Sequence, residues 1–276
     1  DIPSLFQPDY GLNINRLEIP VDTYKAFKCD VPNLSTSLYF VVNDSFYDKA
    51  LPKKELPEGV SVDSLARIAA EKPELISRYY SKIAKTEEDG ITALNTMLAQ
   101  DGLLIYVPKG TVVDRAIQVI NILRSDVDLM VNRRVLIIVE DRAEIKLLFC
   151  DHAADDRRFL ATQVIEAYVG ENAGLDLYCL EETHAKNVRV SNVFISQQAN
   201  SRVNHNVITL HNGTTRNRTD LVVEGVGAEC NLAGCVIADK DQHVDNNTLI
   251  DHKVGHCTSN ELYKYVLDEN AVGAFA

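Results

Sequence analysis

Apolar residues recur at helical spacing between positions 61 and 100. Leu65 and Ile68 lie one helical turn apart and predict a first helix, and Pro73, which suits a first helical turn, opens a second. The apolar residues of this second helix are Leu75, Ile76, Tyr79, Tyr80 and Ile83. A third helix is predicted over residues 92–100. The residues expected to pack it are Leu94, Met97 and Leu98.

Long helices are not expected in the first 57 residues, because most of the prolines of the chain lie there. The run LYFVV at 38–42, followed by Asn43 and Asp44, has the composition of a strand that ends in a turn. We therefore expect an irregular segment with some strand at 1–57 and a short helical region at 58–100.

From residue 101 onward the chain consists of short runs rich in Val, Ile and Leu, broken by Gly, Asn and Asp. These runs lie at 103–107, 116–123, 134–139 and 164–169. No helical pattern of useful length separates them, which argues against a doubly wound α/β fold. A sandwich, a barrel and a solenoid remain.

A weak internal repeat favours the solenoid. A turn followed by alternating apolar positions recurs, and it contains Ala143, Ala173, Ala199 and Ala228, spaced 30, 26 and 29 residues apart, with Ala271 as a later copy. Periods of roughly 20 to 50 residues are typical of stacked coils. Residues 101–276 are thus predicted to form a parallel β-helix with about two strands per coil. The whole chain is expected to be mainly β, and a β-sandwich with irregular loops remains the alternative.

The charge balance bears on the possible partners. Lys and Arg number 28 and Asp and Glu 40, so the net charge of −12 repels phosphate backbones and anionic lipids. A nucleic-acid partner is disfavoured, and no apolar run approaches the roughly 18 to 20 residues that span a bilayer.

The six cysteines are too dilute for a disulfide-stapled scaffold, which predicts a cytoplasmic protein. These cysteines are Cys29, Cys150, Cys179, Cys230, Cys235 and Cys257.

Residues 239–257 hold the densest group of polar side chains. Imidazole and thiolate groups are metal ligands, so His243, His252, His256 and Cys257 are candidate metal ligands. Their spacing is not that of a zinc site, and on a strand the adjacent His256 and Cys257 would face opposite sides. A structural or surface role is the competing interpretation. Cys230 and Cys235 are interpreted as small core thiols.

The same segment carries four aspartates, Asp239, Asp241, Asp245 and Asp251. A β-helix enzyme that acts on polysaccharides would use carboxylates on one sheet face, so a carbohydrate-active enzyme is a second hypothesis. An acid excess on solvated turns explains these residues equally well. The glycine pattern at 225–230 lacks the third glycine of a dinucleotide fingerprint, and no Walker-type motif is present. We assign no catalytic residue.

The stretch DKDQHVDNNTLIDHKVGHCTSNELYK at 239–264 closely resembles the SufB/SufD family of iron–sulfur cluster assembly proteins, on the SufD side. Three further stretches agree with this resemblance: LPEGV at 56–60, EDGITALNT at 88–96 and QDGLLIYVPKG at 100–110. The resemblance covers most of the chain and is weakest over the first 55 residues.

The resemblance implies a right-handed parallel β-helix flanked by helical segments. It also implies a non-enzymatic scaffold subunit that pairs with a SufB-like subunit and docks the ATPase SufC, in a complex that builds iron–sulfur clusters. We expect the cluster at the level of the complex and no cofactor bound directly by this chain. The chain is expected to be truncated at both ends, so no functional residue of the family carries over, and an exposed sheet edge at Ala276 predicts a homodimer in isolation.

Overall fold

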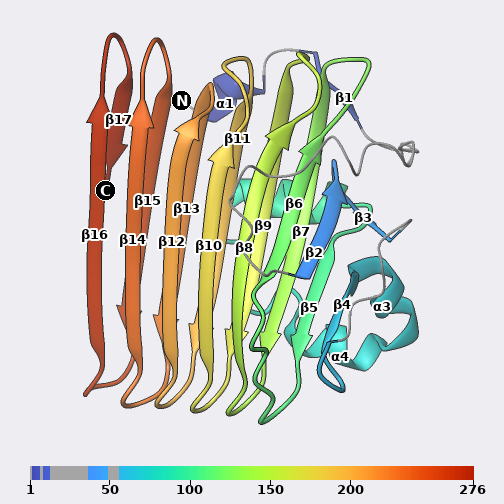
Figure 1. Cartoon of the computed structure of the whole chain (residues 1–276), viewed down its shortest axis with the longest axis vertical. Coiled ribbons are helices and arrows are strands. Elements are labelled where there is room, and N and C mark those ends of the chain that lie inside the picture. Colours follow the sequence, from blue (N-terminus) through green and yellow to red (C-terminus); the bar gives the residue numbers. More distant parts are fainter. Residues whose placement is uncertain (1, 7–8, 13–36, 49–55) are drawn as a thin grey trace.

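The computed structural model describes residues 2–6, 9–12, 37–48 and 56–276. Its strands form two long sheets that enclose one apolar core (Figure 1). Sheet A contains, in spatial order, β17 (Val272–Phe275), β15 (His243–His252), β13 (Thr214–Val223), β11 (Val188–Gln197), β9 (Phe159–Val169), β7 (Leu129–Val139), β5 (Leu103–Val107) and β4 (Ser61–Ser64), with β1 (Gly11–Leu12) also paired to β7. Sheet B contains β16 (Thr258–Leu267), β14 (Glu229–Ala238), β12 (Arg202–His211), β10 (Gly174–Glu182), β8 (Glu144–Ala153), β6 (Ile117–Leu123), β2 (Ser37–Val42) and β3 (Ser45–Tyr47).

From β5 onward the chain alternates between the two sheets, so each strand pairs in parallel with the strand one full coil away. Leu160 on β9, for example, pairs with Met130 on β7 and with Val188 on β11. Consecutive coils therefore take between 26 and 32 residues. The prediction of a parallel β-helix is confirmed, and the β-sandwich alternative is wrong.

The repeated turn leads from sheet A to sheet B. Ala143, Ala173 and Ala228 occupy equivalent buried positions in it, stacked through backbone bonds along the solenoid. Two alignments from the sequence need correction. Ser201, not Ala199, takes this position in its coil, and Ala271 lies in the opposite turn, between β16 and β17. Alanine at one turn residue is a weak marker because serine fills the same small space.

In each of these turns the residue before the stacked position has a left-handed backbone conformation, with a positive φ. The residues are Arg142, Asn172, Asn200, Gly227 and His256. Asparagine and glycine tolerate this conformation at low cost, which explains their presence between the strand-like runs.

The helices cover part of the outer face of sheet A (Figure 1). They are α3 (Leu65–Glu71), α4 (Pro73–Tyr79) and α5 (Gly90–Leu98), in addition to α1 (Ile2–Leu5) near the N-terminus. The Ser64 hydroxyl caps α3 and the Asp89 carboxylate caps α5. The three predicted helices are present, but α4 ends at Tyr79, before the predicted Tyr80 and Ile83, and the packing face of the third helix was wrong. Ile91, Thr92 and Asn95 are its buried residues, whereas Met97 is 71% exposed.

The strand expected at 38–42 is confirmed as β2, which forms a hairpin with β3 through the Asn43–Asp44 turn. Much of the segment 1–57, including Cys29 and the prolines at 20, 32 and 52, lies outside the described residues.

Candidate functional site

The candidate metal ligands do not converge on one point. His243 begins β15 and His252 ends it, which separates them by about 30 Å at roughly 3.3 Å per residue. His256 and Cys257 lie in the following turn, His256 in the left-handed conformation with φ 58°. His243 thus lies at the edge of the solenoid where the chain enters sheet A, and the other three residues lie at the opposite edge, where it leaves sheet A.

Two of these three residues, His252 and Cys257, have other partners. His252 Nε2 lies 3.1 Å from Ser259 Oγ, and the Cys257 thiol lies 3.3 Å from the carbonyl oxygens of Gly225 and Gly255. Within the described parts of the chain, no group of three or more His, Cys, Asp or Glu side chains is arranged to hold a metal ion.

The four aspartates are also dispersed. Asp239 and Asp241 lie in the turn before β15, and Asp251 lies at the far end of that strand. Asp239 pairs with Lys240 at 3.2 Å and Asp251 with Lys253 at 2.5 Å, while Asp245 lies 4.0 Å from Arg216. Each of these three carboxylates therefore has a basic neighbour, as expected for a solvated surface.

The sequence reasoning missed a polar cluster inside the solenoid. Asp151 on β8 accepts bonds from Arg133 Nη1 at 2.8 Å and from Arg189 Nε at 2.7 Å. Arg189 Nη1 also lies 2.6 Å from Glu181 Oε1 on β10. All four side chains are at most 6% exposed. The cluster joins the inner faces of both sheets, since the two arginines come from sheet A and the two carboxylates from sheet B.

Neutral polar groups extend this cluster toward β15. Glu181 accepts bonds from Thr209 and Asn217, and Asn217 Nδ2 bonds Asn246 Oδ1 at 3.0 Å. Asn246 Nδ2 in turn donates to Tyr265 Oη at 2.6 Å. A signal for this interior stripe was present in the sequence, because Asn121, Asp151, Glu181 and Thr209 recur with the coil period at one inward position.

Burial alone would raise the pKa of Asp151, but Arg189 and Arg133 outweigh it and hold the pKa below its usual range. Burial raises the pKa of Glu181, and Arg189 opposes this only in part. Burial also raises the pKa of the Cys179 thiol, and it raises that of Cys230 to about 11. These two interior cysteines are therefore protonated thiols at neutral pH and poor nucleophiles.

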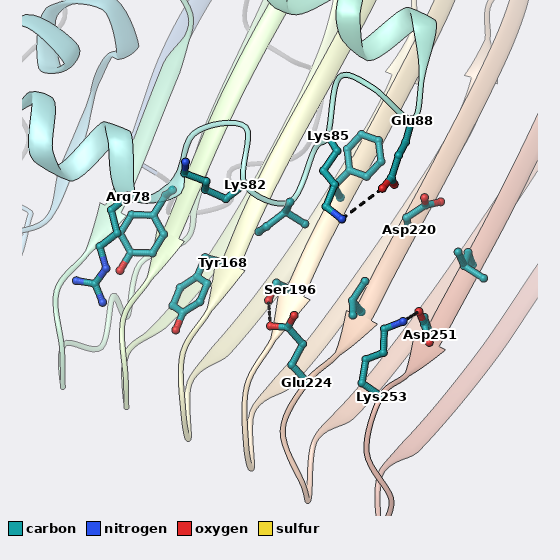
Figure 2. Close-up of a pocket in the computed structure, with 15 residues that line it drawn as sticks. Arg78, Lys82, Lys85, Glu88, Tyr168, Ser196, Asp220, Glu224, Asp251 and Lys253 are labelled. Atoms are coloured by element: carbon teal, nitrogen blue, oxygen red, sulfur yellow. Dashed lines mark hydrogen bonds and ion pairs between the residues drawn. The ribbon is translucent and has the colours of Figure 1, made fainter.

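A groove of about 610 Å³ lies on the outer face of sheet A beside α4 (Figure 2). Arg78 on α4 and Lys82, Lys85 and Glu88 on the segment before α5 form one side. The floor consists of outward side chains of β9, β11, β13 and β15. The floor residues are Tyr168, Phe194, Ser196, Asp220, Val222, Leu249 and Asp251. We refer to this feature as the sheet A groove.

The strand register arranges the floor in two rows. Phe194, Asp220 and Leu249 are successive cross-strand partners. The second row runs through Tyr168, Ser196, Val222 and Asp251. The sequence could not reveal this groove, because the residues of its floor lie about 80 to 170 positions along the chain from those of the side at α4.

Two known protein families match this chain, one over its N-terminal part and one over most of the solenoid. Residues 1–119 match the family described as the SufBD protein N-terminal region. Residues 121–276, which contain most of the solenoid, match the SUF system FeS cluster assembly, SufBD core domain. The chain belongs to the SufBD family. The resemblance seen in the sequence is thereby confirmed at the level of the family.

Individual relatives of the SufBD family are distant. The chain is 22% identical to the iron–sulfur cluster assembly SufBD family protein slr0076 of Synechocystis sp., over 94% of this chain and 59% of that protein. It is 28% identical to the iron–sulfur cluster assembly protein SufD of Bacillus subtilis, over 48% of this chain and 30% of that protein. The chain thus spans less than two thirds of the length of these relatives. No helix in the described ranges has the length and apolar character needed to cross a bilayer.

Proposed function

We propose that this chain is part of a non-catalytic scaffold subunit of a SUF-type iron–sulfur cluster assembly complex. The observation that carries the proposal is the match of both halves of the chain to SufBD families, one of which is described as a core domain of FeS cluster assembly.

The proposed partners are a SufB-like subunit and, for the full-length protein, a SufC-like ATPase, with this chain in the SufD position. A relative named SufD supports that position. A homodimer is the proposed state of this chain in isolation, and the cytoplasm is the proposed compartment.

The test is depletion of the full-length protein in its own organism. The activity of an enzyme that needs a [4Fe–4S] cluster should fall while the amount of its polypeptide stays constant, and the full-length gene should restore the activity. Unchanged cluster occupancy of such enzymes after complete depletion would contradict a role in cluster assembly.

A further inference from the structure

We propose that the sheet A groove is a docking site for one amphipathic, acidic segment of a partner protein. The proposal does not depend on the SUF assignment. Its basis is the size of the groove, the apolar part of its floor and the distribution of charges around it.

The dimensions suit one peptide segment. The floor spans four strands, which at about 4.8 Å between neighbours gives a width of roughly 14 Å. A helix with its side chains is about 10–12 Å across. The same face of sheet A already holds a helix, because α4 packs its buried residues Ile76 and Tyr79 against Leu136 and Ile138 on β7. A segment in the groove would extend this helical layer over β13 and β15.

The floor offers apolar surface that this layer leaves open. Phe194 is 7% exposed at the edge of the helical cover, where it packs with Ile83. Two strands further on, Leu249 is 51% exposed in the same row of the floor. An amphipathic segment would cover Leu249 and the half-buried Val222, and the burial of apolar area would drive its binding.

Most charges of the groove are paired within the chain. Lys85 lies 3.3 Å from Glu88, and Asp251 lies 2.5 Å from Lys253. The Asp220 carboxylate lies 2.6 Å from Arg218 Nη2. These pairs leave little net charge along the floor and at the end of the groove near β15.

The side of the groove at α4 is cationic. Neither Arg78 nor Lys82 has a carboxylate partner in the part of the chain that the structure describes, and the Arg78 guanidinium lies 5.1 Å from the centre of the Tyr79 ring. Across the floor, Glu224 accepts bonds of 2.8 Å from Ser196 and Gln198. The acidic end of a bound segment would therefore lie beside Arg78 and Lys82, away from Glu224.

A protein segment fits these observations better than a membrane does. A flat bilayer surface does not reach the floor of a groove that is walled by α4 and the segment after it. The net charge of −12 also repels anionic lipids, whereas the local cationic edge attracts an acidic peptide.

The test uses two fluorescently labelled amphipathic peptides of about four helical turns. Both carry leucines along one face, with glutamates on the other face of the first and lysines on that of the second. Fluorescence anisotropy should show that the acidic peptide binds the chain and the basic peptide does not. The double variant Arg78→Glu/Lys82→Glu should weaken binding by about tenfold or more, and Leu249→Asp should also weaken it. All three substituted side chains are exposed, so circular dichroism spectra and melting temperatures should not change.

Lys264→Glu, which reverses one charge on β16 outside the groove, should leave binding intact. Equal binding of the two peptides, no binding of the acidic peptide, or unchanged binding by Arg78→Glu/Lys82→Glu would each overturn the proposal. Binding to vesicles of phosphatidylglycerol tests whether the surface recognises a membrane instead. If these vesicles bind through Arg78 and Lys82 while the acidic peptide does not, the surface recognises a membrane and the proposal is wrong.

Discussion

Arg134 and Glu166 form an ion pair that is completely enclosed, with Arg134 Nη2 2.7 Å from Glu166 Oε2 and both side chains 0% exposed. The Glu166 carboxylate also accepts bonds from the backbone N–H groups of Ser81, Ile83 and Ala84. One carboxylate on β9 thus fixes the segment between α4 and α5 on sheet A. This segment forms most of one side of the sheet A groove.

We predict that Glu166→Gln destabilises the chain by about 3 kcal/mol, because it leaves the Arg134 charge buried without its counter-charge. Urea denaturation measures this loss of unfolding free energy. Hydrogen exchange of the amides of Ser81, Ile83 and Ala84 should accelerate at the same time, since their shared acceptor is weakened.

Glu171→Gln provides the matched control, because Glu171 is exposed in the turn after β9. We expect it to change stability by less than about 0.5 kcal/mol. A loss below about 1 kcal/mol for Glu166→Gln, or unchanged exchange of the three amides, would show that this carboxylate does not hold the segment.

His205 should make stability depend on pH. The ring is fully buried on β12, and burial lowers the pKa of His205 to about 4 from its ordinary value near 6.5. Between these values the unfolded chain binds a proton that the folded chain does not. Stability is therefore lost as the pH falls from about 6.5 to about 4, by about 3 kcal/mol from this residue.

His205→Leu should remove this contribution, and leucine suits the site because the cross-strand partners of His205 are Leu177 and Leu232. Urea denaturation of both proteins from pH 7 to pH 4 gives the difference in stability. His243→Gln, at an exposed position, should follow the parent. Parallel curves for the parent and His205→Leu would contradict the prediction.

Gly234 leaves space for an aromatic ring on the next coil. A Cβ atom at Gly234 would overlap the ring of Tyr263, whose centre lies 4.7 Å from that of Phe275. We predict that Gly234→Ala costs about 1 to 3 kcal/mol by displacing the ring. The double variant Gly234→Ala/Tyr263→Leu should lose less stability than the sum of its single variants, because leucine removes the overlap. Additive losses in thermal denaturation would show that the two positions do not interact.

The regular parts of the fold were predictable from the sequence for a physical reason. Alternating runs such as the one on β8, where Ile145 and Leu147 point inward, repeat with the coil period, and Pro73 begins α4 as expected for a first helical turn. The face of α5 was not predictable, because Asn95 is buried through bonds to Thr162 and to the Arg133 carbonyl. A polar residue that is buried through tertiary contacts looks like a surface residue in the sequence.

Closeness in the sequence was also a poor guide to which candidate metal ligands lie together in space. The closeness of His243 and His252 in the sequence becomes a long separation once both lie on one strand. Conversely, Arg133 and Asp151 lie on different strands and meet inside the solenoid. The division of the chain at residues 57 and 100 remains a prediction, as does any metal binding by His252, His256 or Cys257.

Complex formation by the full-length protein tests the central claim most directly. The full-length protein should be mixed with the SufB-like and SufC-like proteins of its own organism and measured by size-exclusion chromatography with light scattering, with the 276-residue chain measured in parallel. The account predicts one species with the mass of a complex that contains all three proteins, and a homodimer for the 276-residue chain alone. Separate elution of the full-length protein from both partners at micromolar concentration would contradict the scaffold assignment.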